Sequence, residues 1–205
     1  MVDQAHKLSK EFTACAGLVS EGSANAISGM AAMLGQDIKV TSLRVAQIPV
    51  REAANLVGGY EALSVGIYLA VSGSATGHMF MIYPPATALG LVDMLMGQPP
   101  GTTTSLDEME ESALAELGNV TGSFFLNALA DATGSTFLPS PPAVMMDMAG
   151  AILDVALADI MEVSDEALIV ETNFGSPDRQ ISGSFLVMPS PDLMRVLLDS
   201  LSSEK

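Results

Sequence analysis

The sequence predicts an α+β fold made of two similar halves, and two observations carry this prediction. First, a long helix, a strand, a short helix, a pair of strands and a closing helix follow one another twice along the chain. Second, short motifs recur at constant spacing: Gly77, Val92-Asp93 and Leu95 recur 106 positions later as Gly183, Leu198-Asp199 and Leu201, and Asn25-Ala26-Ile27 recurs 102 positions later as Asn127-Ala128-Leu129. A duplicated unit predicts one pseudo-twofold domain over residues 1–205, with an antiparallel sheet backed by two long helices.

The first half, about residues 7–100, follows from periodicity and from its turn residues. Apolar residues recur every three or four positions over 7–34 and predict a long helix that ends at Gly35. The remaining predicted elements are a strand over 38–48, a short helix over 50–57 stopped by Gly58 and Gly59, strands over 62–71 and 78–83, and a helix over 85–97. Residues 98–105, "QPPGTTTS", read as a linker.

The second half, about residues 105–203, repeats this order. Its long helix is predicted to run from about Ser105 to Thr133 and to stop at Gly134, with a capping box that begins at Ser105 or at Thr104. Acids at 107, 108, 110 and 111 suit the positive end of the helix dipole and are interpreted as capping and solubility. A strand over 142–149, a helix over 151–161, strands over 166–174 and 182–188 and a helix over 191–201 complete the half.

The composition excludes several classes of protein. The chain of 205 residues is 49% hydrophobic and 16% charged, which indicates a folded protein. Its net charge is −16, and no Lys or Arg occurs between Arg51 and Arg179, so phosphate backbones would be repelled and we expect no nucleic-acid binding. The acidity favours a basic partner, but solubility or a salty cytoplasm would explain it equally. A single cysteine, Cys15, excludes an internal disulfide.

No targeting or membrane segment is visible. The N-terminal residues are polar and lack the apolar stretch of a secretory signal. The mean hydropathy is +0.40, but the most apolar window is interrupted by Ser72-Gly-Ser-Ala-Thr-Gly-His78 and reads as two strands and a turn. We therefore expect a cytoplasmic location without membrane insertion.

The second long helix carries a polar stripe. Ser112, Glu116, Asn119, Ser123 and Asn127 follow one another at intervals of four, three, four and four, which places them on one narrow face of a helix. We expect the core-facing positions roughly a quarter turn or more away, at Met109, Ala113, Leu117, Val120, Phe124 and Ala128. The stripe is either a solvated face or a prepared site.

Two features favour a prepared site. Gly118 and Gly122 stand in mid-helix, where each costs on the order of 1 kcal/mol relative to Ala, and a flat, closely approachable surface would explain them. In addition, "FLPSPPAV" (137–144) follows, and its prolines can rigidify a loop beside the stripe.

The pattern Ser112-x3-Glu116-x2-Asn119-x22-Pro142 resembles the signature of the CheC, CheX and FliY family of chemotaxis phosphatases. The words "ELGNV", "SFFLNALADATG" and "LPSPPAVMMDMAGAILD", "GHMFMIYP" in the first half and the two-half organisation are similar to that family as well. The similarity spans nearly the whole chain.

This resemblance implies a phosphatase that hydrolyses the aspartyl-phosphate of phosphorylated CheY. By resemblance, Asn119 would orient the attacking water and Glu116 would pair with a lysine of the regulator, while Ser112, Ser123 and Pro142 would bind the partner or support the site. An acyl phosphate is labile, so positioning and electrostatics suffice for its hydrolysis. The Mg²⁺ ion would belong to the regulator, and no cofactor or metal of the chain's own is expected.

The first long helix departs from the family. CheC proteins usually carry a second Glu-x2-Asn there, but alignment on Asn25-Ala26-Ile27 puts Ala14 and Gly17 at these positions, and a shift of one residue puts Cys15 and Leu18 there. The chain therefore resembles a CheC in which only the second long helix keeps an active site.

A different class of function stays open. A module of the same fold can act by contact alone, through CheD, the receptor deamidase that CheC proteins bind, or through another chemotaxis or flagellar protein. His6 and His78 have no nucleophile near them in a recognisable motif, so neither is expected to be catalytic, and Cys15 is interpreted as a core residue. The 14 methionines, Met145-Met146 and Met148 among them, are interpreted as core filling.

Overall fold

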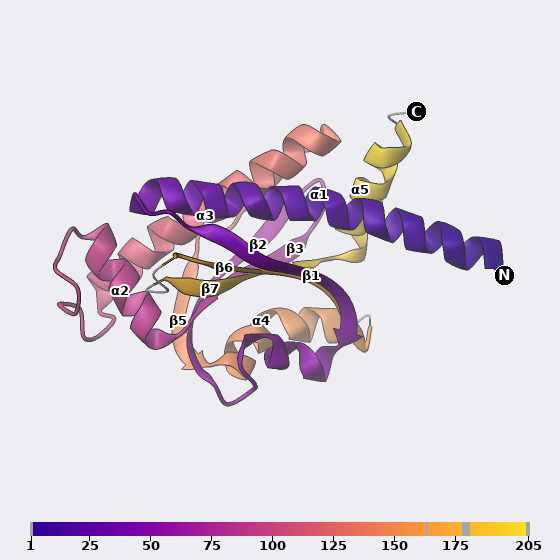
Figure 1. The fold of residues 1–205 in the computed structure, drawn as a ribbon. Coiled ribbons are helices and arrows are strands. Elements are labelled where there is room, and N and C mark those ends of the chain that lie inside the picture. The colour runs from indigo at the N-terminus through magenta and orange to yellow at the C-terminus, as the bar shows by residue number, and fades with distance from the viewer. Residues whose placement is uncertain (1, 163, 178–180, 204–205) are drawn as a thin grey trace.

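The computed structural model describes the backbone of residues 2–162, 164–177 and 181–203, and within these ranges the side chains of residues 15 and 17–201 (Figure 1). The helices are α1 (Val2–Leu34), η1 (Val50–Val57, a 3₁₀ helix), α2 (Pro85–Leu95), α3 (Glu108–Thr133), α4 (Ala149–Met161) and α5 (Pro191–Ser203). The strands are β1 (Lys39–Pro49), β2 (Leu63–Gly73), β3 (Gly77–Tyr83), β4 (Phe137–Pro139), β5 (Ala143–Met148), β6 (Glu166–Gly175) and β7 (Ser182–Pro189).

The described strands form one seven-stranded sheet in which the two halves exchange strands. The order is β1-β6-β7-β3-β2-β4, β5 also pairs with β2, and every pairing is antiparallel. Each half supplies a hairpin, β2–β3 or β6–β7. The strand that precedes each hairpin crosses to the other half, because β1 pairs with β6 and β5 pairs with β2. The sheet is therefore built jointly by both halves.

The hairpins meet at β3 and β7, where Phe80 pairs with Leu186. These residues are 106 positions apart, which is also the spacing between Gly77 at the start of β3 and Gly183 near the start of β7. The two neighbouring pairs, Met79 with Val187 and Met81 with Phe185, are related to each other by the same spacing, because Phe185 and Val187 lie 106 positions after Met79 and Met81. A pseudo-twofold axis consequently passes between Phe80 and Leu186, and the predicted α+β fold with duplicated halves is confirmed.

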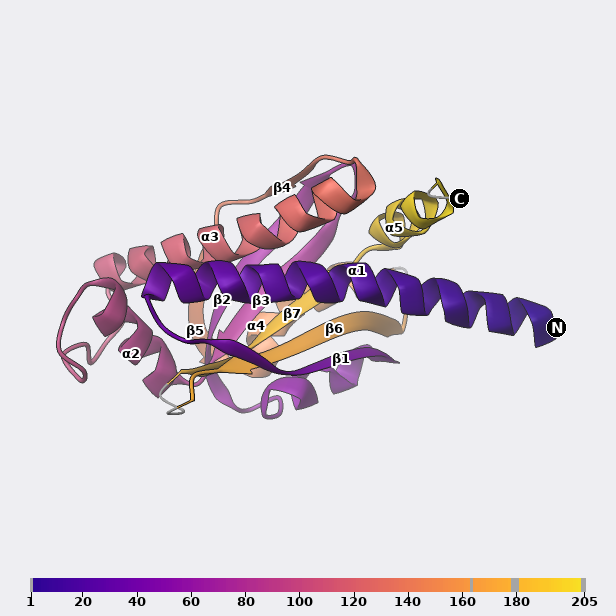
Figure 2. The ribbon, with the colours of Figure 1, turned by 45° about the horizontal axis from the view of Figure 1, so that its top comes forward.

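Helices cover both faces of this sheet. The long helices α1 and α3 lie side by side on one face and run in opposite directions, while η1 and α4 cover the other face (Figures 1 and 2). Because successive strand residues point to opposite faces, Met81 joins the larger core under the long helices and Phe80 joins the smaller core under η1 and α4. The two predicted long helices therefore back the sheet, as expected.

The core-facing side of α3 was predicted wrongly. Of the six expected positions only Leu117 is buried, whereas Met109 and Phe124 are 66% and 48% exposed. The residues that α3 buries are Leu114, Leu117, Gly118, Thr121, Gly122, Phe125, Leu126 and Leu129. The small residues at 118, 121 and 122 are not strongly hydrophobic. The pattern of large apolar residues therefore predicted a buried face that is rotated around the helix axis from the observed one. The polar stripe consequently faces almost directly away from the sheet, about half a turn from the buried side.

The starts of the two long helices also differ from the prediction, and one strand was missed. Helix α1 begins at Val2, not at residue 7. Helix α3 begins at Glu108 with Asp107 as its N-cap, and the backbone N–H of Asp107 donates to Glu110 Oε2 at 3.2 Å, so neither expected capping register is used. The acids there do cap the helix, as interpreted. Strand β4 was not predicted, because three residues that end in a proline are too short to show a periodicity.

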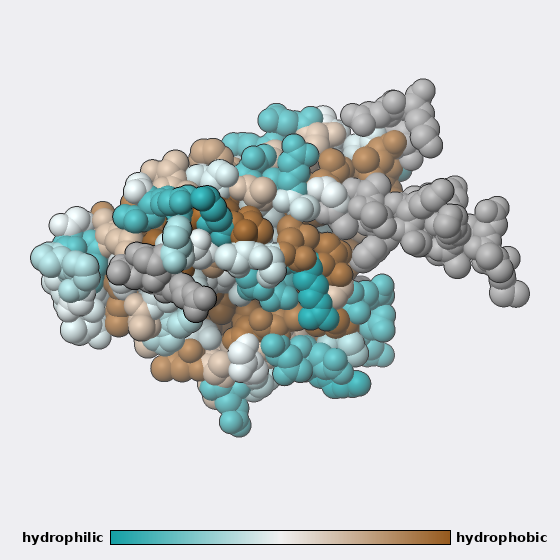
Figure 3. All heavy atoms as spheres, in the orientation of Figure 1, coloured by the Kyte–Doolittle hydropathy of each residue, from teal (hydrophilic) through white to brown (hydrophobic). Residues whose placement is uncertain are grey.

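The methionines fill the core only in part. Met30, Met79, Met81 and Met188 are fully buried, which agrees with the prediction. Met146 and Met148 are 49% and 43% exposed because β5 lies at the edge of the sheet. Figure 3 shows hydrophobic side chains reaching the surface in several patches among hydrophilic ones. In the ranges described, none of the helices combines the length and the hydropathy that crossing a bilayer requires.

Candidate active site

The polar stripe lies on the accessible face of α3. Ser112, Glu116, Asn119 and Asn127 are exposed, and Ser123 is half-buried. Glu116 and Asn119 are three residues apart on a continuous helix, so their side chains are neighbours on one face. The structure therefore brings these predicted residues together on a surface that a partner protein can reach.

The glycines of α3 hold the other side of the helix against β2. A Cβ at position 118 would fall 2.5 Å from Ile67 Cγ2, and a Cβ at position 122 would fall 3.1 Å from Leu69 Cδ2. Both glycines are buried. The close approach expected at Gly118 and Gly122 therefore exists, but it is made to the sheet and does not flatten the exposed face. This corrects the interpretation of these glycines as part of the stripe's surface.

Pro142 lies beside α3 at Gly118, on the side of the helix that faces the sheet. A Cβ at position 118 would be 3.6 Å from Pro142 Cβ, so this proline flanks α3 between the sheet and the stripe. The preceding strand β4 pairs with β2 and runs along α3 (Figure 2). Residues 137–142 thus form a wall along one side of α3.

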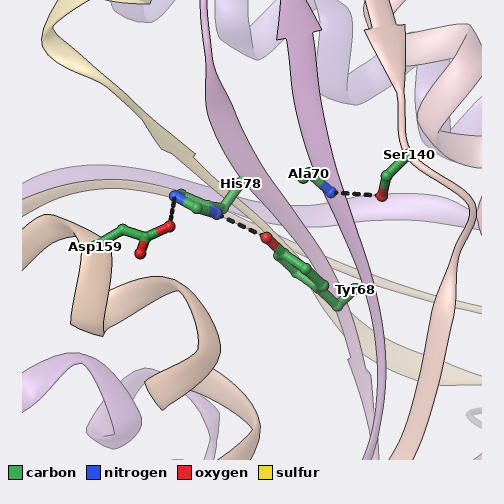
Figure 4. Close-up of polar contacts among 5 residues, drawn as sticks. All are labelled: Tyr68, Ala70, His78, Ser140 and Asp159. Atoms are coloured by element: carbon green, nitrogen blue, oxygen red, sulfur yellow. Dashed lines mark hydrogen bonds and ion pairs between the residues drawn. The ribbon is translucent and has the colours of Figure 1, made fainter.

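Ser140 anchors this wall to the sheet, a role that the sequence reasoning missed. Its Oγ accepts a hydrogen bond from the backbone N–H of Ala70 at 3.0 Å, and its own N–H donates to the Ala70 carbonyl at 2.8 Å (Figure 4). The side chain thereby takes a sheet hydrogen bond where prolines interrupt the strand. A serine between prolines, in "PSPP", is the signal that could have revealed it.

Helix α1 flanks the opposite side of α3. A Cβ at Gly29 would clash with the Phe124 ring at 2.5 Å, and one at Gly22 would lie 3.0 Å from the Phe125 ring. These glycines therefore receive the two aromatic rings where the long helices cross. Because Phe124 and Gly118 lie on opposite sides of the stripe, α1 and the wall at 137–142 border it on its two flanks.

The corresponding part of α1 carries no carboxylate–amide pair. Cys15 is 1% exposed and belongs to the main core, as interpreted from the sequence. Leu18 is half-buried and packs against that core, and Gly17 is exposed with no atom within 4 Å of a Cβ placed on it. The side chains of Ala14 and His6 lie outside the described residues. Within the described part of the chain, no three His, Cys, Asp or Glu side chains are grouped to hold a metal ion.

Comparison with known proteins connects this geometry to a family. Residues 109–146 match the sequence profile of the CheC-like family, and this span includes Ser112, Glu116, Asn119, Ser123 and Pro142. The CheY-P phosphatase CheC of Bacillus subtilis (strain 168) is 30% identical to the chain over 186 residues, which cover 89% of each protein. The chain belongs to the CheC family.

Solved structures agree with this assignment at the level of the fold. FliY of Thermotoga maritima superposes with a TM-score of 0.65 at 18% identity, covering 90% of this CheC-family chain and 91% of FliY. The CheX–CheY–BeF3–Mg complex of Borrelia burgdorferi contains a chain that matches with a TM-score of 0.53 at 18% identity, covering 83% and 97% of the two chains. The CheC-family chain therefore shares its fold with FliY and with a chain of the CheX–CheY complex.

Proposed function

We propose that this CheC-family protein is a phosphatase that hydrolyses the aspartyl-phosphate of a phosphorylated CheY-type response regulator at a single site on α3. The observation that carries the proposal is the exposure of Glu116 and Asn119 on one face of α3. The names of its relatives support it: the Bacillus subtilis protein is a CheY-P phosphatase, and a CheX of similar fold forms a complex with CheY, BeF3 and Mg²⁺.

In the proposed reaction, water attacks the phosphorus atom, the bond between phosphorus and the aspartyl oxygen breaks, and inorganic phosphate and the free carboxylate leave. Asn119 orients the water, because its amide offers both donors and an acceptor. Glu116 pairs with a lysine of the regulator and fixes the docked position, since close charge pairs across an interface set its register. Ser112 and Ser123 line the same contact. The Mg²⁺ ion belongs to the regulator.

A rigid exposed stripe suits a reaction in which the regulator carries the phosphate and this protein positions the water. Phosphoryl transfer needs positioning and electrostatic stabilisation more than covalent chemistry. The packing of Gly118 on β2 and the anchoring of residues 137–142 by Ser140 hold one side of α3 in place, and the contact of Phe124 with Gly29 of α1 holds the other. The protein thus presents a preformed carboxylate and amide to a partner that carries the phosphate and the metal.

The decisive experiment measures phosphate release from a phosphorylated CheY with wild-type protein and with Asn119→Ala. We expect hydrolysis to fall on the order of tenfold to a thousandfold while binding persists, since the docking carboxylate remains. Equal rates of phosphate release with the wild-type and Asn119→Ala proteins would contradict the phosphatase proposal. A binding module that acts through CheD or another chemotaxis protein would then take its place.

A further inference from the structure

A second candidate site lies at one end of the sheet, and none of the stripe residues lines it. A cavity of about 780 Å³ opens between the C-terminal end of α4, the start of α5 and the adjoining ends of the strands. Its lining includes apolar side chains of Val71, Leu168 and Met188. This volume and mixed lining are typical of pockets for small organic ligands.

One wall of the cavity carries a chain of three polar side chains (Figure 4). The Tyr68 hydroxyl lies 3.0 Å from Nδ1 of His78, and Nε2 of His78 lies 3.9 Å from an Asp159 carboxylate oxygen. Burial lowers the pKa of His78 and outweighs the opposing effect of Asp159, so the imidazole is neutral at neutral pH. His78 therefore does not neutralise Asp159, whose side chain is 72% exposed.

Two further carboxylates line the same cavity. Glu166 accepts a hydrogen bond from Gln47 Nε2 at 2.7 Å, a contact that leaves its charge in place. Asp192 is paired with Arg195. Within the described ranges no Lys or Arg contributes to the lining, so Asp159 and Glu166 give the cavity a negative potential over an apolar floor.

The pseudo-twofold axis supplies an internal comparison. A cavity of about 510 Å³ occupies the equivalent place in the other half. At the spacing of 106 residues, Ile82, Tyr83 and Pro84 replace Met188, Pro189 and Ser190, and Ser184 replaces His78. Among the described residues none with a charged side chain lines this second cavity. The fold therefore requires neither the histidine nor the carboxylates at this place. The acidic residues of the first cavity are also not a simple result of the chain's high negative charge, because the described lining of the second cavity has none.

We propose that the cavity at His78 binds a small organic cation, an ammonium or guanidinium group carried on an apolar body. The cation lies against Asp159 and Glu166, and the apolar body lies over Met188 and Leu168 with the Tyr68 ring beside it. The feature that distinguishes this cavity is its negative charge, since the described lining of the equivalent cavity in the other half of the same molecule is uncharged. The site is separate from the proposed phosphatase site, and either can fail without the other.

The test is a titration of the full chain, followed by NMR, with three probes of matched shape: phenethylammonium, 2-phenylethanol and phenylacetate. The chain contains two histidines, so the His78 imidazole resonance can be assigned with a single variant. At about 0.15 M salt, where unspecific attraction is screened, we expect saturable shifts at His78 with phenethylammonium, weaker shifts with the alcohol and none with phenylacetate.

Matched variants locate the binding. Asp159→Asn removes a lining charge and should weaken phenethylammonium binding about two- to fivefold. Glu162→Gln removes an exposed acid beyond the end of α4 that does not line the cavity, and should leave binding unchanged. Equal binding of the alcohol and the ammonium, equal weakening by both variants, or no saturable shift at His78 would each overturn the proposal.

Discussion

Gly118 of α3 packs so closely on Ile67 of β2 that a Cβ at position 118 would lie 2.5 Å from Ile67 Cγ2. We predict that Gly118→Ala destabilises the protein by about 1 to 3 kcal/mol through overpacking, although Ala is the better helix former. Gly17→Ala is the matched control, because nothing lies within 4 Å of its Cβ in α1, and it should stabilise by roughly 0.5 to 1 kcal/mol. Urea unfolding of both variants measures the difference. A Gly118→Ala protein as stable as wild type would show that α3 can move off the sheet freely.

Glu116→Ala should affect docking as well as turnover. If Glu116 pairs with a lysine of the regulator, its loss lowers affinity, and the remaining affinity depends less on salt. Binding and phosphate release are measured over a salt series. Glu111→Ala is the control, since Glu111 is an exposed acid of the same helix that lies off the stripe. If both variants shift the salt dependence equally, the general field of the acidic chain controls docking and Glu116 has no specific role.

Changes at the corresponding part of α1 should spare activity. Cys15→Ala and Leu18→Ala together should leave phosphate release intact, because no carboxylate–amide pair stands there. Both side chains contribute to the main core, so the free energy of unfolding should fall by about 2 kcal/mol. Thermal unfolding and turnover are compared on the same preparation. A large loss of turnover in a fully folded variant would show that the first long helix also carries a working site.

Asp93 should make the linker between the halves sensitive to acid. This buried carboxylate accepts backbone N–H bonds from Gly101 at 2.6 Å, Thr102 at 3.2 Å and Thr103 at 2.8 Å. A hydrogen bond from the Thr103 side chain and these backbone bonds lower the pKa of Asp93 below its ordinary 3.8, although burial opposes the shift. The stabilisation is therefore present above pH 3.8 and is lost as pH falls through the lower pKa of the folded state.

Asp93→Asn removes this charge, so it should lower the melting temperature at pH 7 by several degrees and flatten the acid side of the stability profile. Asp107→Asn changes an exposed acid near the same linker and is the comparison. An unchanged melting temperature for Asp93→Asn would show that the neutral amide accepts these bonds equally well.

His78 should give a second pH dependence of the same sign, at higher pH. Its pKa in the folded protein lies below the ordinary 6.5 because of burial, so the unfolded chain takes up a proton first as pH falls. Stability should therefore decrease from about pH 6.5 downward until the pKa of the folded state is reached. His78→Asn should lose less stability than wild type between pH 7.5 and 5.5, as measured by denaturant unfolding. Parallel profiles would contradict a neutral buried imidazole.

Local patterns in the sequence determined the elements and their duplication. The 3.6-residue and two-residue periodicities depend on neighbours along the chain, and they predicted nearly every helix and strand. The spacing of 106 residues, read from a few repeated positions, reappears in the pairing of Phe80 with Leu186. The stripe from Ser112 to Asn127 was also predictable, because residues on one helix keep their relative angles in any fold.

Only the tertiary structure decided which way α3 faces and which strands pair. α3 packs against both the sheet and α1, and its contact with the sheet uses Gly118 and Gly122, whose lack of a side chain permits close approach but leaves no hydrophobic signal. The exchange of β1 and β5 between the halves joins residues 75 or more positions apart, which no local periodicity records. The same holds for the cavity at His78, since Tyr68, Asp159 and Glu166 meet only because the sheet and α4 bring distant segments together.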